Sequence, residues 1–130
     1  MKNKEAYDEV VGKLIYDDAW FSVNYFTYVN KPVYFVFEAF EDEKLTDGQR
    51  VNYLYATKNL KQLLKNALLA IKKISNSDFV KRVYVTQVYF TRNDEFGFLM
   101  EIENADELDL AVKFNTNGEI IGIGEQDILI

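Results

Sequence analysis

The sequence contains no cysteine and no histidine. Without cysteine the chain has no disulfide, no thiolate nucleophile and no zinc–sulfur site. Without histidine it lacks the usual general base, the Ser-His triad and the commonest transition-metal ligand. We therefore expect that the protein is not an enzyme and that it holds no metal and no cofactor.

Long apolar runs are also missing. No run approaches the roughly 20 residues of a membrane-spanning helix, and the first five residues lead into no signal-peptide core. We expect a cytoplasmic protein without a membrane partner. With 130 residues, 48% hydrophobic and 28% charged, the composition is that of a globular protein, and we expect a single domain over residues 1–130. Ten phenylalanines and nine tyrosines favour a sheet-rich fold.

One long helix is predicted over residues 46–74. Thr46 and Gln49 have the spacing of a capping box, in which each side chain bonds the backbone amide of the other residue. After Gly48 the segment has neither glycine nor proline, and its apolar residues recur at helical spacing. Six basic residues and one acid, Asp47, make this segment strongly basic. Leu54, Leu68 and Leu69 lie among or beside those bases, which indicates wider burial or an apolar surface left for a partner.

Alternating patterns predict strands before and after this helix. They cover residues 12–16, 19–29, 33–40, 80–90, 96–103, 108–114 and 119–123, and residues 126–130 are a candidate for a last edge pairing. The pattern over residues 2–11 is compatible with either a short helix or a frayed arm. Turns are expected at residues 30–32 and at Asn117-Gly118, and a loop at 75–78. The fold class is therefore α+β, with a mostly antiparallel sheet of six to eight strands and the helix on one face.

Charge is divided unevenly along the chain. Residues 93–130 contain ten acids and one lysine, whereas the helical segment carries a net charge of +5. The simpler interpretation is that the basic helix and the acidic strands each face water on opposite surfaces of the molecule. The sharper hypothesis is an acidic docking surface for a basic protein. The residues predicted to bind that partner are Glu101, Glu103, Asp106, Glu107 and Asp109. A net charge of −6 and one basic helix face do not provide the field that nucleic-acid binding needs, so we expect no nucleic acid.

A second interpretation is a small-ligand-binding or enzymatic domain. It uses the aromatic hairpin over residues 19–40 and Glu38, which is the one acid within an aromatic strand. More often such a glutamate faces solvent or pairs with a neighbouring base. Trp20 and the aromatic residues after it are more often core than pocket. A third interpretation is a structural subunit that forms a homo-oligomer.

Motifs spread over nearly the whole chain are similar to a known group of proteins. They are Gly12-Lys13-Leu14, Asp17, Trp20, Thr46-x-x-Gln49, Asn59, Gly97-Phe98, Asp106-Glu107 and the closing stretch Gly118 to Asp127. This layout resembles small bacterial domains of uncharacterised function that are grouped with immunity proteins of polymorphic toxin systems. The group often carries a tryptophan and a histidine near residues 105–111, and this chain has neither there. A site built on that histidine would be missing.

The resemblance implies a non-catalytic binding protein that blocks a partner. An immunity protein neutralises a cognate toxin, and an acidic surface would suit a basic toxin such as a nuclease, encoded nearby. We expect the chain to act in this way, as a monomer or a homodimer.

Overall fold

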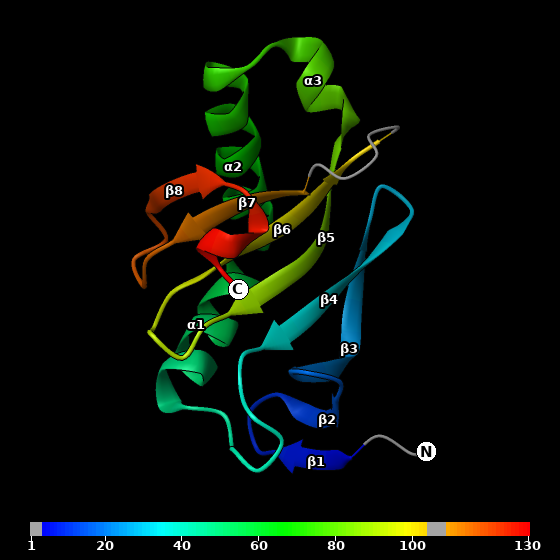
Figure 1. Ribbon diagram of the computed structural model, residues 1–130, viewed down its shortest axis with the longest axis vertical. Helices are drawn as coiled ribbons and strands as arrows, with labels where there is room; N and C mark the ends of the chain where they lie inside the picture. The colour runs from blue at the N-terminus through cyan, green and yellow to red at the C-terminus, as the bar shows by residue number, and fades with distance from the viewer. Residues whose placement is uncertain (1–3, 104–108) are drawn as a thin grey trace.

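The computed structural model describes residues 4–103 and 109–130 and shows an α+β fold (Figure 1). Within these residues eight strands form one sheet, and their order in space is their order in the chain. All neighbouring strands are antiparallel except β4 and β5, which are parallel. The predicted fold class is confirmed, because the sheet is mostly antiparallel and the helices lie on one of its faces (Figure 1).

The strands are β1 (Glu5–Asp8), β2 (Gly12–Tyr16), β3 (Trp20–Tyr28), β4 (Lys31–Phe37), β5 (Val83–Phe90), β6 (Phe96–Ile102), β7 (Asp109–Phe114) and β8 (Ile120–Gly124). The helices are α1 (Asp47–Lys58), α2 (Leu60–Ile74), α3 (Ser77–Arg82) and the short 3₁₀ helix η1 (Gln126–Ile128). In the described part of the chain, no helix combines the length and apolar character that crossing a bilayer requires.

The predicted capping box starts the helical region. The Thr46 hydroxyl accepts a hydrogen bond from the backbone amide of Gln49 at 3.0 Å, and Gln49 Oε1 accepts one from the backbone amide of Thr46 at 2.9 Å. The region continues to Ile74 but is divided into α1 and α2 at Asn59, whose side chain donates to the Tyr55 carbonyl at 2.9 Å. Asparagine side chains compete in this way for backbone groups, which accounts for the interruption.

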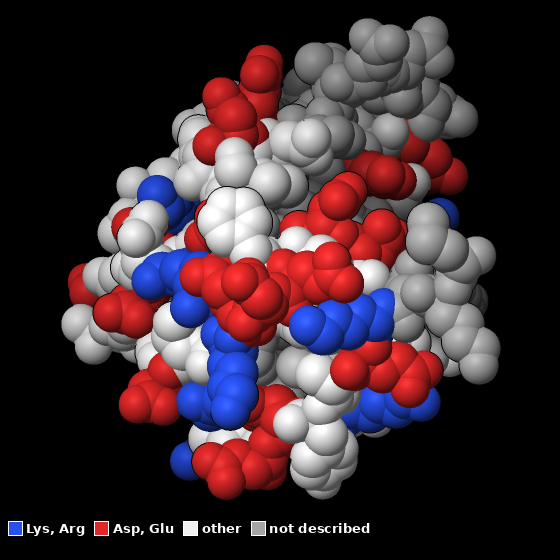
Figure 2. Space-filling view, turned by 60° about the horizontal axis from the view of Figure 1, so that its bottom comes forward, with Lys and Arg blue, Asp and Glu red and all other residues white. Residues whose placement is uncertain are grey.

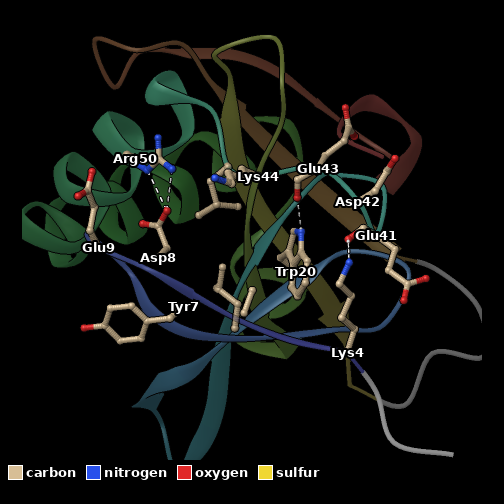
Figure 3. Close-up of a pocket in the computed structure, with 13 residues that line it drawn as sticks. Lys4, Tyr7, Asp8, Glu9, Trp20, Glu41, Asp42, Glu43, Lys44 and Arg50 are labelled. Carbon is tan, nitrogen blue, oxygen red and sulfur yellow. Dashed lines mark hydrogen bonds and ion pairs between the residues drawn. The ribbon is translucent and has the colours of Figure 1, made fainter.

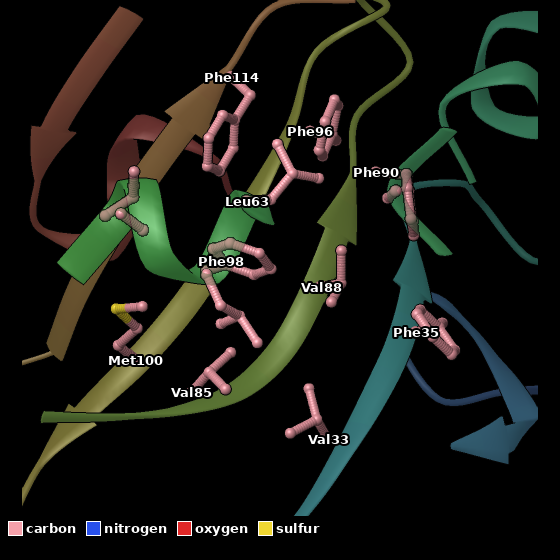
Figure 4. Close-up of a cluster of buried hydrophobic side chains, with 14 of the residues drawn as sticks. Val33, Phe35, Leu63, Val85, Val88, Phe90, Phe96, Phe98, Met100 and Phe114 are labelled. Atoms are coloured by element: carbon pink, nitrogen blue, oxygen red, sulfur yellow. The ribbon is translucent and has the colours of Figure 1, made fainter. Parts of the chain in front are cut away.

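The main core lies between the sheet and these helices (Figure 4). Four phenylalanines stand opposite one another in register on β4 to β7, with adjacent ring centroids 4.8, 6.0 and 5.3 Å apart. They are Phe37, Phe90, Phe96 and Phe114, and all are fully buried. From the helices, Leu63, Leu64, Ala67 and Ile71 complete this core. Its burial is the main stabilising contribution to the fold.

A smaller apolar cluster lies on the opposite face of the sheet. Its members are Ala19, Val36, Tyr89, Leu99, Ala111 and Leu129. Leu129 follows η1 and rests on Gly97 of β6, where an added Cβ would lie 2.2 Å from the Val112 carbonyl oxygen. Only glycine fits this close approach. The C-terminal segment thus covers the β6–β8 part of this face, and the predicted edge pairing of residues 126–130 is wrong.

The other differences from the predicted elements follow from local chemistry. Residues 75–78 are not a simple loop, because the Asn76 side chain accepts from the Phe79 amide and caps α3. The strand predicted from residue 80 therefore starts at Val83. The β3–β4 turn is formed by Val29 and Asn30, both at positive φ, so Lys31 already belongs to β4.

The link from β4 to β5 is a helical crossover, residues 38–82, and not a hairpin. The crossover explains the parallel pair at the centre of the sheet, because parallel neighbours need a long connection. The Asn117-Gly118 turn is confirmed, and Gly118 has a positive φ of 77°. The segment over residues 2–11, for which the sequence leaves a short helix and a frayed arm as alternatives, contains strand β1 at the edge of the sheet.

Candidate functional site

The predicted partner-binding acids divide into those that the structure describes and those that it does not. Glu101 lies in β6 and Glu103 directly after it, and both are exposed. Asp106 and Glu107 lie outside the described residues. Asp109 is the first residue of β7 and the register partner of Glu101, but its side chain is not described. The structure therefore places three of the five residues at one end of the β6–β7 pair.

Glu101 is joined to a tyrosine on the neighbouring strand. Tyr84 of β5 is its register partner, and the tyrosine hydroxyl donates to Glu101 Oε2 at 2.6 Å. This hydrogen bond raises the pKa of Tyr84, with further contributions from partial burial and from the charges of Glu101 and Glu103. The phenol stays protonated at neutral pH and holds the carboxylate in place at the surface.

Two more tyrosines lie on the same face of the sheet. Tyr25 of β3 and Tyr34 of β4 are register partners with ring centroids 5.6 Å apart, and they are 58% and 40% exposed. Tyr34 stands opposite Gln87 of β5, which places these rings beside the strand that carries Tyr84. A hollow of about 390 Å³ opens next to Tyr25 and Tyr34. We call the surface formed by Val23, Tyr25, Tyr34, Tyr84 and Glu101 the tyrosine face.

The tyrosine face already holds one cation from within the chain. The ammonium nitrogen of Lys31 lies 4.2 Å from the centroid of the Tyr84 ring. A cation at this distance is attracted by the negative face of the ring. The same surface therefore offers aromatic rings and carboxylates, the two kinds of group that bind arginine and lysine side chains.

Among residues 4–103 and 109–130, the arrangement of the layers leaves the β3–β5 part of this face without a covering helix. The helices cover the opposite face of the sheet, and η1 with Leu129 covers only the β6–β8 part of this one (Figure 1). Sequence reasoning had a signal for this, since β3 and β4 have few polar positions on either side. It missed Tyr84 and Tyr34 as site residues, because only the register shows Tyr84 beside Glu101 and Tyr34 on the strand next to β5.

The other described acids of residues 93–130 come from several different elements. Glu95 begins the other end of β6 and pairs with Lys113 at 2.9 Å, and Asp127 lies in η1. Figure 2 turns the lower end of Figure 1 towards the reader and shows carboxylates interspersed with basic side chains. Of the predicted partner-binding acids, the two with described side chains are Glu101 and Glu103, and both lie at the end of β6.

A separate cavity of about 490 Å³ lies beside β1, between that strand and the segment after β4 (Figure 3). Its interior groups are hydrogen-bonded within the chain. Asp8 Oδ1 accepts from two nitrogens of Arg50 at 2.9 and 2.8 Å, and the indole nitrogen of Trp20 donates to the Glu43 carbonyl at 2.8 Å. Burial of Asp8 acts to raise its pKa, but the bonds from Arg50 and the Val10 and Val11 amides outweigh burial and lower it. These contacts hold β1 against α1.

Glu38 lies outside the aromatic hairpin, just after β4, and its carboxylate accepts from the Arg92 amide at 2.9 Å. Its backbone carbonyl accepts from Gln49 at 2.8 Å. Nearby, burial, with the charges of Glu38 and Tyr16 adding to it, raises the pKa of Tyr89 to about 12. Glu38 is thus a hydrogen-bonded residue at the end of a strand, and it lines none of the cavities of about 490, 550 and 390 Å³.

Comparisons of the chain with protein-family models, with curated proteins and with solved structures gave no significant match. Among the described residues, no group of three or more acidic side chains is arranged to hold a metal ion.

Proposed function

We propose that the protein is a non-catalytic binding protein that uses its tyrosine face to hold a basic segment of another protein. The observation that carries this proposal is the part of the sheet that no described helix covers, where the Tyr25–Tyr34 pair of β3 and β4 and the Tyr84–Glu101 pair of β5 and β6 lie on the same face. Tyrosine is enriched at protein interfaces because it supplies a large, rigid contact area and a hydroxyl at little cost in conformational entropy.

The chemistry of this face favours a partner rich in arginine or lysine. Such side chains stack on tyrosine rings and pair with carboxylates, and Lys31 over Tyr84 is an internal example of the first contact. Glu101 and Glu103 add negative charge at the margin, where it raises the rate of encounter and selects basic partners.

The resemblance to immunity proteins supports a toxin as the partner. In this proposal the face would cover a basic surface of the toxin, such as the nucleic-acid-binding surface of a nuclease. Inhibition would follow from blocking that surface and would require no chemical step.

The test is co-expression with the protein encoded by the adjacent gene. We expect the wild-type chain to form a stable complex and to restore growth when that protein is toxic. Glu101→Lys should weaken the complex at least about tenfold, equivalent to about 1.4 kcal/mol, because a rim carboxylate becomes a like charge towards the partner. Added salt should weaken the wild-type complex as well.

The matched control is Asp78→Lys, the same reversal of charge at an exposed position on α3. It should leave the complex unchanged. Equal losses for Glu101→Lys and Asp78→Lys would show that net charge, and not the tyrosine face, governs binding. Absence of any complex with the neighbouring product would count against a toxin partner, and a symmetric dimer lost in Tyr34→Arg would assign the face to self-association.

A further inference from the structure

A groove on the other side of the molecule has different chemistry. It lies between α2 and the end of β3, with Val80 of α3 at its margin, and has a volume of about 550 Å³. Such a volume lies within the range of small-molecule sites, about 300–1,000 Å³. The groove belongs to the open margin of the main core, where the helices extend no further over the sheet.

Its inner surface is apolar. Leu64 is buried at the base, and the half-buried residues around it are Phe26, Tyr28, Leu60, Leu68 and Val80. Leu69 is 49% exposed and also lines the groove. These residues would remove the chain of an apolar ligand from water, which is the main source of affinity for such a chain.

Its rim is basic. The charged residues that line the groove are Lys61, Lys65 and Lys72 of α2, and no aspartate or glutamate from the described ranges lines it. Their spacing of four and seven residues places them along one side of the helix. All three are exposed, and none forms a salt bridge within the described residues. This concentration of positive charge is unusual in a chain with a net charge of −6.

We propose that this groove binds an amphipathic anion with a single alkyl chain, such as a medium-chain fatty acid. The alkyl chain would lie along Leu64 and Leu68, and the carboxylate would meet the lysines of the rim. From Leu60 to Lys72 the groove follows about 18 Å of helix, which suits one extended chain. An acidic helix of a partner protein, about 10–12 Å across, would occupy far more than 550 Å³ over that length.

Sodium dodecanoate, used below its critical micelle concentration, is the probe. Calorimetric titration of the intact protein should show saturable binding of one molecule, and amide shifts in ¹H–¹⁵N spectra should concentrate on α2 and the end of β3. The cationic analogue dodecyltrimethylammonium has the same alkyl chain and should bind at least tenfold more weakly. Acetate should not bind, because it has no chain to bury.

Two pairs of variants separate the groove from the rest of the helical surface. Lys65→Gln should lower dodecanoate affinity about threefold or more, whereas Lys58→Gln removes the same charge from the same helical region away from the groove and should not. Leu69→Glu should abolish binding. Leu54→Glu alters a leucine of similar exposure, 54%, that does not line the groove, and should have no effect.

Equal affinity for the cationic and anionic probes would overturn the proposal, because the lysines would then have no role in recognition. Equal losses in Lys65→Gln and Lys58→Gln would overturn it too. Binding to vesicles of anionic lipid without saturable binding of monomeric dodecanoate would assign the surface to a membrane instead. None of these results bears on the tyrosine face, which lies on the opposite side of the sheet.

Discussion

Gln49 is the side chain that fixes the start of the helical crossover to the sheet, and its removal should be costly. It is fully buried and makes three hydrogen bonds. Its oxygen accepts from the Thr46 amide, and its nitrogen donates to the carbonyls of Glu38 at 2.8 Å and Phe90 at 3.1 Å. At about 1 kcal/mol for each bond, and with about 1 kcal/mol for the void, Gln49→Ala should lower the free energy of unfolding by about 4 kcal/mol.

The substitution Gln49→Glu tests the side-chain nitrogen of Gln49, which donates two hydrogen bonds, separately from its oxygen. The new side chain keeps the oxygen that accepts from Thr46 but turns a second oxygen towards the two carbonyls of Glu38 and Phe90. The carboxylate form is disfavoured there, so the pKa of the introduced carboxyl rises above its unfolded value of about 4.3. The unfolded state then loses its proton first as the pH rises. Relative to the wild type, the variant should therefore be least destabilised below about pH 4 and should lose stability as the pH rises through the raised folded pKa.

Urea denaturation followed by tryptophan fluorescence measures both effects, because Trp20 is the only tryptophan and is buried. Gln62→Ala is the control, since Gln62 is exposed and, in the part of the chain that the structure describes, its side chain bonds only Asn66 on the same helix. It should change stability by less than about 0.5 kcal/mol. A loss below about 1 kcal/mol in Gln49→Ala, or a pH-independent Gln49→Glu, would refute the assignment of Gln49 as the link between helix and sheet.

Three further substitutions test other parts of the fold in the same denaturation assay. Gly97→Ala should destabilise by about 1–3 kcal/mol, because the new Cβ has no space beneath Leu129, and an unchanged midpoint would contradict this packing. Asn52→Leu should stabilise by about 1 kcal/mol, since the buried amide of Asn52 has no hydrogen-bond partner among the described residues, and a loss of stability would show that the amide is needed. Asp8→Asn should cost about 2–4 kcal/mol at pH 7 by breaking the pair with Arg50. Because the folded pKa of Asp8 lies below its ordinary value of about 3.8, the deficit should shrink as the pH falls through that folded pKa, and a deficit that stays constant would exclude the ion pair as its cause.

Features that depend on residues close in sequence could be predicted. The capping box of Thr46 and Gln49, the alternation in β6 and the turn at Gly118 each depend on a few neighbouring positions. The cap on α3 was misinterpreted, because the asparagine and serine that favour loops also cap helices, and only the following residues decide which occurs.

Features that depend on pairing between distant strands could not be predicted. Nothing in the sequence indicates that β4 and β5 lie side by side, or that this pairing sets Tyr34 opposite Gln87 on the strand that carries Tyr84. The site predicted from the sequence therefore rests on charge alone and contains only acidic residues. The contact between Tyr84 and Glu101 is clear only once the register of β5 and β6 is known.

The parallel pairing of β4 with β5 divides the molecule in a way that bears on how it folds. On either side of it, each strand pairs with its neighbour in the chain, so β1–β4 and β5–β8 are two ribbons that assemble from short-range contacts. Joining them requires closure of the segment over residues 38–82, and contacts of such long range form slowly. Separately expressed ribbons, one carrying the helices, are thus the natural fragments for a split version of the protein that regains its shape on mixing.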